Sequence, residues 1–114
     1  MAAIQGKSTF PERGTLKMTW TSVTEADTFT ASNEGSRYPD KTIQVSGTFG
    51  GATVLIKGSN DGSTYFTCHG QTGLLSFTSD GGDVIIENYP FLQATHSGGT
   101  GETVTVTIFG ASYV

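Results

Sequence analysis

The strongest constraint on this chain is a two-residue alternation of apolar and polar side chains between Asp40 and Cys68. Such a period places every second side chain on one face, which is typical of a half-buried β-strand. Gly50-Gly51 interrupts the alternation, and Ser59–Ser63 supplies the Asn, Asp and Gly that a tight reversal needs. The segment predicts two strands, a tight turn and a third strand from Thr64. The apolar positions of the first two strands are Ile43, Val45, Gly47, Phe49, Ala52, Val54 and Ile56.

The same alternation recurs along the rest of the chain. Thr15–Val23 places Leu16, Met18 and Trp20 on one face, and we predict Trp20 as a core residue. Glu102–Phe109 alternates valine and isoleucine with threonine. No segment has helical periodicity. We expect eight or nine short strands in an antiparallel β-sandwich, either jelly-roll-like or immunoglobulin-like, because both share this pattern. The shorter strands are expected within residues 26–31, 74–78, 84–86 and 89–96.

Polar and glycine-rich stretches separate these strands. His69–Gly73, Ser79–Asp83 and Ser97–Gly101 predict turns, and Asn33–Asp40 predicts the longest internal loop. Loops of this kind often carry binding residues.

With 114 residues, the chain fits one domain, which we place at residues 15–114. Residues 1–14 show no clear period and contain Gly6 and Pro11, so they are interpreted as an irregular N-terminal arm. Such an arm either docks on a neighbouring chain, frays, or folds over its own domain.

The net charge limits the classes of partner that the chain is expected to bind. A net charge of −4 and a pI near 4.9 disfavour nucleic acid, whose binding needs clustered Lys and Arg. The first residues lack the apolar core of a signal peptide, and no run is long enough to span a bilayer. We therefore expect a protein that is made in a cytoplasm and has no membrane partner. The single cysteine, Cys68, excludes an internal disulfide and is expected to be buried.

Few residues are candidates for chemistry. Asp80, Asp83 and Glu87 lack the longer acidic series of a calcium-binding EF-hand loop. Cys68, His69 and His96 match no common zinc spacing, although the fold could bring Cys68 to His96 as a nucleophile pair. No phosphate-binding or dinucleotide-binding motif is present. We therefore expect a protein that is not an enzyme, with no catalytic residue, cofactor or metal.

Several of these stretches, taken in order, resemble small structural proteins of tailed bacteriophages, in particular capsid decoration (cement) proteins. The resemblance covers about residues 40–110 and departs from the family at Tyr65-Phe66, where Trp is common, and at Phe91, where a basic residue is common. The stretches that carry it are Ile43–Phe49, Ala52–Gly62, Tyr89–Leu92, Ser97-Gly98-Gly99 and the final Thr-Val strand.

The resemblance implies a virion protein that binds the outside of an assembled phage head and stabilises it. The implied partners are the major capsid protein and, in a homotrimer, two further copies of this chain. We predict the contact residues in the arm and the long loop as Ile4, Phe10, Arg13, Arg37 and Tyr38. Because Gly-Ser-Asn-Asp-Gly hairpins also occur in discoidin-like sandwiches, a carbohydrate-binding or adhesion module that uses Tyr38, Tyr65 or Tyr89 is the alternative.

Overall fold

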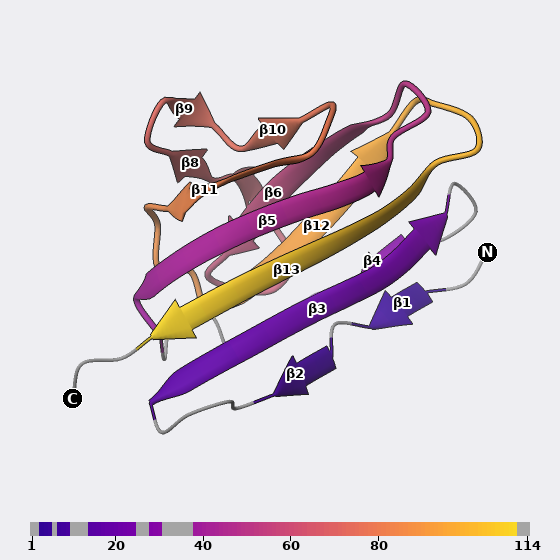
Figure 1. Ribbon diagram of the computed structural model, residues 1–114. Helices are drawn as coiled ribbons and strands as arrows, with labels where there is room; N and C mark the ends of the chain where they lie inside the picture. Colours follow the sequence, from indigo (N-terminus) through magenta and orange to yellow (C-terminus); the bar gives the residue numbers. More distant parts are fainter. Residues whose placement is uncertain (1–2, 6, 10–13, 25–27, 31–37, 112–114) are drawn as a thin grey trace.

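The computed structural model describes residues 3–5, 7–9, 14–24, 28–30 and 38–111, and every regular element in these ranges is a β-strand (Figure 1). The N-terminal strands are β1 (Ala3–Gln5), β2 (Lys7–Thr9), β3 (Thr15–Thr24) and β4 (Thr28–Thr30). The central strands are β5 (Asp40–Thr48), β6 (Thr53–Ser59), β7 (Phe66–Thr67), β8 (His69–Gly70), β9 (Gly73–Leu74) and β10 (Ser76–Phe77). The C-terminal strands are β11 (Gly81–Ile85), β12 (Phe91–Ser97) and β13 (Thr103–Ala111).

Two sheets face each other and form a β-sandwich, which confirms the predicted fold class. The larger sheet has the order β11-β5-β13-β3-β2, and β5, β13 and β3 cross the front of the molecule in Figure 1. In the smaller sheet, β6 pairs along its whole length with β12, while β7 and β10 share its other edge. Two-stranded pairs, β1-β4 and β8-β9, complete the described sheets.

The connections between strands cross repeatedly from one sheet to the other. β5 leads to β6, β11 to β12 and β12 to β13, and each step changes sheet. β3 leads to β4, which lies beside β12 of the smaller sheet. Consecutive strands divided in this way between two sheets produce the jelly-roll arrangement of the prediction.

The inward rows of both sheets form one apolar core. Alternation in β3 buries Leu16, Met18 and Trp20, and Trp20 is 0% exposed, as predicted for a core residue. Because each row faces the opposite sheet, burying it removes apolar surface from water and holds the two sheets together. The other buried members of the core are Ile43, Val45, Phe49, Val54, Ile56, Cys68, Leu75, Ile85, Leu92, Ala94, Val104, Val106 and Ile108.

The predicted turn after β6 is present and is held by side chains. Ser59 Oγ accepts hydrogen bonds from the backbone N–H groups of Asp61 and Gly62, at 3.2 and 3.0 Å. Asp61 Oδ1 accepts bonds from the N–H groups of Thr64 and Ser63, which lower the pKa of Asp61 to about 2. β7 then pairs back on β6, so the hairpin of the prediction is confirmed.

The short elements after the hairpin differ from the prediction. The third strand was expected over residues 64–68, but β7 covers only Phe66–Thr67, and residues 69–73 contain β8 and the start of β9 instead of a simple turn. The strand expected at 74–78 is interrupted at Leu75, whose backbone N–H bonds to Cys68 O while its carbonyl accepts from Ile56 N–H. Backbone pairing with β6 therefore decides this region, and the local residue types do not.

In two further regions the structure forms strands where none was predicted. Residues 81–83 were expected in a turn, but they form most of β11, because they pair with β5 through Gly81↔Val45, Gly82↔Gln44 and Asp83↔Ile43. The first fourteen residues were expected to be irregular, yet β1 pairs with β4 in parallel and β2 pairs with β3. The count of eight or nine strands also falls short of the thirteen within the described ranges.

Candidate ligand-binding groove

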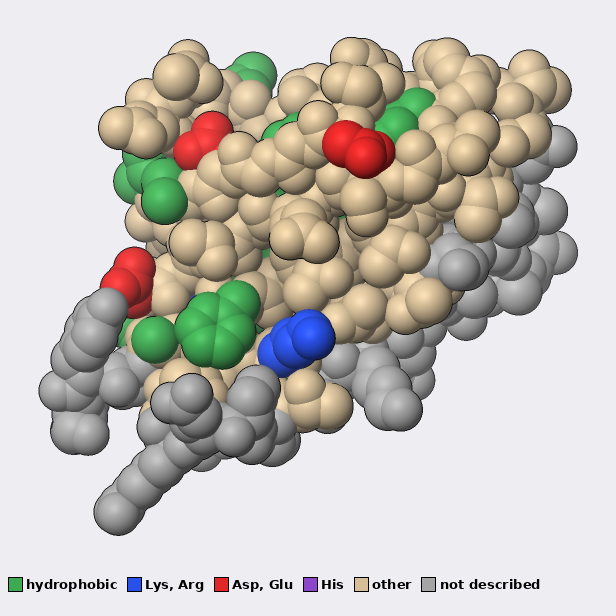
Figure 2. Space-filling model, viewed as in Figure 1, with side chains coloured by type: hydrophobic (Ala, Val, Ile, Leu, Met, Phe, Trp, Pro, Cys, Tyr) green, Lys and Arg blue, Asp and Glu red, His purple; other side chains and the backbone are tan. Residues whose placement is uncertain are grey.

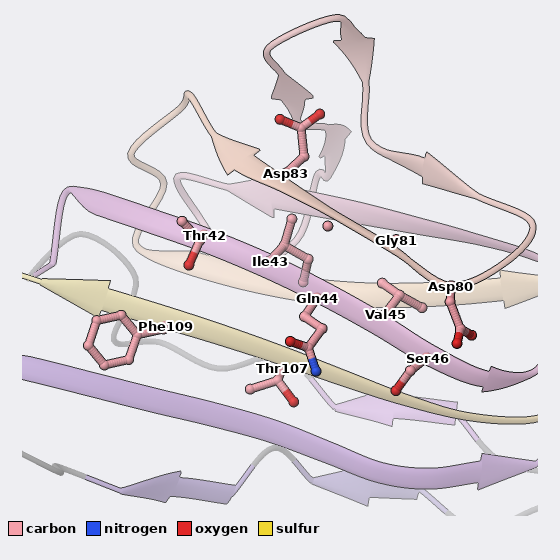
Figure 3. Close-up of a pocket in the computed structure, with 11 residues that line it drawn as sticks. Thr42, Ile43, Gln44, Val45, Ser46, Asp80, Gly81, Asp83, Thr107 and Phe109 are labelled. Carbon is pink, nitrogen blue, oxygen red and sulfur yellow. The ribbon is translucent and has the colours of Figure 1, made fainter.

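A hollow lies on the outer face of the larger sheet, above β5 and between β11 and β13. It measures about 790 Å³ and is open to solvent (Figure 3). Side chains that point outward from β5 and β13 form its floor, with Phe109 near one end and Asp80 near the other (Figure 3). Figure 2 shows this face as mainly polar side chains and backbone, with few charged groups.

The depression forms beside Gly82, which has no side chain. Gln44 of β5 has Gly82 as its partner in β11 and Thr107 as its partner in β13. Since side chains of paired residues share a face, a residue larger than glycine at position 82 would project beside Gln44. Because Gly82 has no side chain, the cross-strand row Gly82, Gln44 and Thr107 has side chains on β5 and β13 but none on β11.

The polar side chains of the floor have no hydrogen-bond partners among the described residues. Thr42, Gln44, Ser46 and Thr107 line the hollow, and none of their side chains hydrogen-bonds to another residue in the described part of the chain. Together they offer three hydroxyl groups, which donate and accept, and one amide with separate donor and acceptor atoms. The floor is therefore able to bind a ligand with several hydroxyl or amide groups.

An aromatic ring borders this polar floor. Phe109 is 40% exposed although it lies within β13, where the other outward residues are threonines. Its partners on the two neighbouring strands are Thr42 of β5 and Lys17 of β3. One face of the groove thus has an apolar platform beside hydrogen-bonding groups.

Two carboxylates lie at the β11 side. Asp80 Oδ1 accepts a hydrogen bond from the Gly47 N–H at 3.0 Å, which fixes the loop before β11 against the end of β5. Asp83 Oδ1 accepts from the N–H groups of Gln71 and Val84. Asp83 pairs with Ile43, whose side chain faces the core, so the Asp83 carboxylate points away from the groove floor and towards the β8–β9 turn (Figure 3). Among the lining residues, Asp80 brings a carboxylate to the rim at one end, and Lys17 of β3 lies beside Phe109 at the other.

The candidate nucleophile pair is not formed. Cys68 is 0% exposed, and burial raises the pKa of its thiol to about 12. Its backbone lies along one edge of β6, whereas His96 belongs to β12 on the other edge. The imidazole of His96 bonds Glu102 through Nδ1 at 2.6 Å, and that of His69 bonds Glu87. The fold therefore gives each histidine a carboxylate partner and leaves the thiol protonated in the core.

The acidic residues of the sequence do not converge either. Asp80 bonds Gly47, Asp83 bonds the β8–β9 turn and Glu87 bonds His69. Among the described residues, no group of three or more His, Cys, Asp or Glu side chains is placed to hold a metal ion. The described residues also contain no helix suited to cross a bilayer.

Only part of the predicted contact set falls within the described residues. Phe10, Arg13 and Arg37 lie outside them, and for Ile4 only the backbone, in β1, is described. Tyr38 is half-buried against the core, and its carbonyl accepts a hydrogen bond at 3.0 Å from the Nζ of Lys41. That ammonium group also donates to Asn88 Oδ1 at 2.7 Å, and burial lowers the pKa of Lys41.

The expectation of exposed tyrosines is wrong. Tyr38 and Tyr89 pack against the core, because Tyr89 covers the side-chain-free surface of Gly58, and Tyr65 is half-buried. Among the residues whose side chains the structure describes, the exposed aromatic residues are two phenylalanines, Phe66 at 61% and Phe109 at 40%. Not all apolar residues are used in the core, since Leu74 and Ile86 are also more than 60% exposed.

Sequence reasoning missed the groove. One signal was available, because Phe109 occupies the outward position that continues the series Thr103, Thr105 and Thr107. The second determinant, Gly82 opposite Gln44, depends on how β11 pairs with β5. That register is not visible in either segment alone.

Comparisons with known proteins extend the fold assignment. The chain matches no protein-family model and no curated protein. A crystal structure of the SPBc2 prophage-derived protein YomS superposes with a TM-score of 0.63 at 13% identity, and the match covers 91% of this chain and 100% of YomS. IMPa from Pseudomonas aeruginosa, solved in complex with an O-glycopeptide, gives 0.45 at 17% identity and covers 96% of this chain but 13% of IMPa. The Cnp3 cupin domain of Schizosaccharomyces pombe gives 0.38 at 10% identity, over 94% of this chain and 64% of the domain. The chain is therefore similar in fold to a prophage-derived protein over almost the whole length of both.

Proposed function

We propose that this chain is a structural virion protein that decorates the outside of an assembled phage head and stabilises it. The end-to-end fold similarity to the prophage-derived YomS supports this proposal, because it links the complete sandwich, and not a fragment of it, to a phage-encoded protein. Binding to the assembled shell alone would shift the equilibrium towards assembly. Three copies joined as a homotrimer would strengthen several modest contacts through multivalency.

The sandwich separates two surfaces that such a protein would use. Strand β2, near the start of the chain, forms one edge of the larger sheet, whereas the groove lies near the opposite edge, at β11. We propose that the N-terminal segment and the loop before Tyr38 contact the major capsid protein, with Ile4, Phe10, Arg13 and Arg37 as further contact residues.

The test is attachment to particles. Heads are purified by density-gradient banding from a lysate of a host that carries the gene, and the chain is quantified in the band by mass spectrometry. We expect a fixed ratio of this chain to the shell protein, and restored occupancy when purified chain is added to heads from a deletion strain. Absence of the chain from the heads would contradict the proposed function.

Replacing two arginines by glutamate tests the predicted contact residues independently of the proposed decoration function. The double substitution Arg13→Glu with Arg37→Glu should lower occupancy on deletion-strain heads, while the matched reversal Lys57→Glu, on β6 of the smaller sheet, should not. Equal occupancy of both variants would show that the contact lies elsewhere while the decoration role stands. Light scattering of the free protein measures whether it is a trimer.

A further inference from the structure

The groove on the larger sheet has the chemical character of a saccharide site. Its floor combines the unpartnered groups of Thr42, Gln44, Ser46 and Thr107 with the exposed ring of Phe109. A volume of about 790 Å³ lies within the range of small-molecule sites. We propose that this groove binds a neutral oligosaccharide, with one sugar ring against Phe109 and its hydroxyl groups over β5.

The two kinds of lining group fit the two kinds of surface on a sugar. A pyranose ring has hydroxyl groups around its rim and a face of C–H groups. The face of a phenyl ring carries negative charge density, which attracts the slightly positive hydrogens of those C–H groups. The hydroxyl groups of the sugar then replace water at the amide of Gln44 and the hydroxyls of Thr42 and Thr107, so no polar group is left unsatisfied.

Other ligand classes fit the lining less well. An apolar ligand would cover Gln44 and three hydroxyl groups without bonding them, and each unsatisfied polar group costs free energy. A phosphate or a nucleic acid would meet the carboxylate of Asp80 at one end of the groove, and a single cation, Lys17, lies beside Phe109 at the other end among the described neighbours of the lining. The Asp80 carboxylate also disfavours acidic sugars. The ligand is therefore expected to be uncharged.

The geometry also predicts the order in which residues matter. Phe109 supplies the apolar platform, so its loss removes the contact that the other groups cannot replace. Gln44 lies between Gly82 of β11 and Thr107 of β13. A larger side chain at the exposed position 82 should fill the groove, at the cost of a tight contact of its Cβ with the Ile43 carbonyl oxygen, 3.1 Å away.

The experiment is an NMR titration of the full chain with lactose, cellobiose, maltose and chitobiose as probes, each at millimolar concentration. We expect at least one to bind weakly, with a Kd of about 1 mM, as for a shallow site. Amide signals of β5, β11 and β13 should shift. Phe109→Ala should weaken binding roughly tenfold. The matched control, Phe66→Ala, removes another exposed phenylalanine, on β7, and should leave the affinity unchanged.

Charge provides a second, independent readout. Sialyllactose differs from lactose by an acidic sugar, so it should bind more weakly than lactose if lactose binds, and Asp80→Asn should narrow the difference. The proposal is overturned if none of the four neutral probes shifts these signals, if Phe109→Ala binds as tightly as the wild type, or if sialyllactose binds better than lactose. Occupancy on phage heads is measured separately, so failure of this site does not affect the proposed decoration role.

Discussion

Two histidine–glutamate pairs of the same chemistry occupy opposite environments in this sandwich. In the β8–β9 region, the side chains of His69 and Glu87 are 53% and 25% exposed. At the junction of β12 and β13, those of His96 and Glu102 are 8% and 1% exposed, with Nδ1 and Oε2 2.6 Å apart. Water can replace the partner in the first pair but not in the second. The comparison shows how burial, and not the pairing itself, sets what a pair contributes to stability.

The largest effect is expected at the buried pair. His96→Ala would leave Glu102 inside the protein without its partner, and Oε1 of this carboxylate already has none. Removing one member of a buried pair typically costs about 3–5 kcal/mol of unfolding free energy, because a charge stays desolvated and unpaired. Urea denaturation at neutral pH measures the loss.

A double replacement tests the cause of that loss. His96→Leu combined with Glu102→Leu removes both polar groups, so the protein should recover most of the stability lost in His96→Ala. If the single variant loses less than about 1 kcal/mol, Glu102 is better solvated than its burial indicates.

The alternation in the sequence indicates that His96 and Glu102 both face inward, but it does not show that the two side chains form a pair. His96 continues the inward row Leu92, Ala94 of β12, and Glu102 precedes the inward row Val104, Val106 of β13. Alternation therefore places both in the core. A polar residue at the end of an apolar row is, however, usually the point where a strand leaves the core, and only the three-dimensional fold shows that the two rows end beside each other.

The same distinction explains which elements were predictable. The long strands β3, β5, β6 and β13 were placed to within a few residues, because alternation over seven or more residues specifies both the strand and its inward face. The two-residue strands β7 to β10 were not, since their positions depend on pairing with β6 and with each other. The groove was missed for a related reason. Gly82 reads locally as a turn residue and becomes part of a sheet only through β5.

The next largest effect concerns the turns beside the buried pair. The N–H of Thr100 donates to the carbonyl of Gly50 at 3.0 Å, which joins the turn after β12 to the turn after β5. Gly50 has φ of 58°, and a Cβ there would overlap the carbonyl oxygen of Thr100. Gly50→Ala should therefore separate the turns, let water reach the pair and lower the unfolding free energy by about 2 kcal/mol.

Gly101 offers a matched control for that substitution. Its φ is 69°, but a Cβ would meet nothing within 4 Å, so Gly101→Ala tests the backbone conformation without the clash. It should cost about 1 kcal/mol. Equal losses in the two variants would show that the contact between the turns does not protect the pair.

Lowering the pH should reveal the smaller contribution of the exposed pair, His69 and Glu87, to the unfolding free energy. Partial burial alone would raise the pKa of Glu87, but hydrogen bonds from the backbone N–H and imidazole of His69 outweigh it, so the pKa lies below its usual value. A carboxyl whose pKa is lowered on folding contributes stability above the unfolded pKa, about 4.3, and loses it as pH falls through the folded value.

The expected result is a difference between two pH profiles. Between neutral pH and the acid limb, the unfolding free energy of the wild type should fall more than that of Glu87→Gln, which cannot titrate at this position. Asp61, whose pKa is about 2, is present in both proteins, so its effect in the same direction cancels from the difference. Parallel profiles would mean that Glu87 is as well solvated in the folded chain as in the unfolded one.

The smallest effect is expected for His69→Ala, at the exposed end of the comparison. Its imidazole is about half-exposed, and an exposed ion pair typically contributes only about 0–1 kcal/mol. The substitution also keeps the backbone N–H of His69, which donates to Glu87 Oε1 at 2.7 Å, so the loop stays tied to β8. A double-mutant cycle with Glu87→Gln measures the coupling of the two side chains apart from that backbone bond. A coupling as large as the loss in His96→Ala would show that geometry, and not exclusion of water, decides the strength of both pairs.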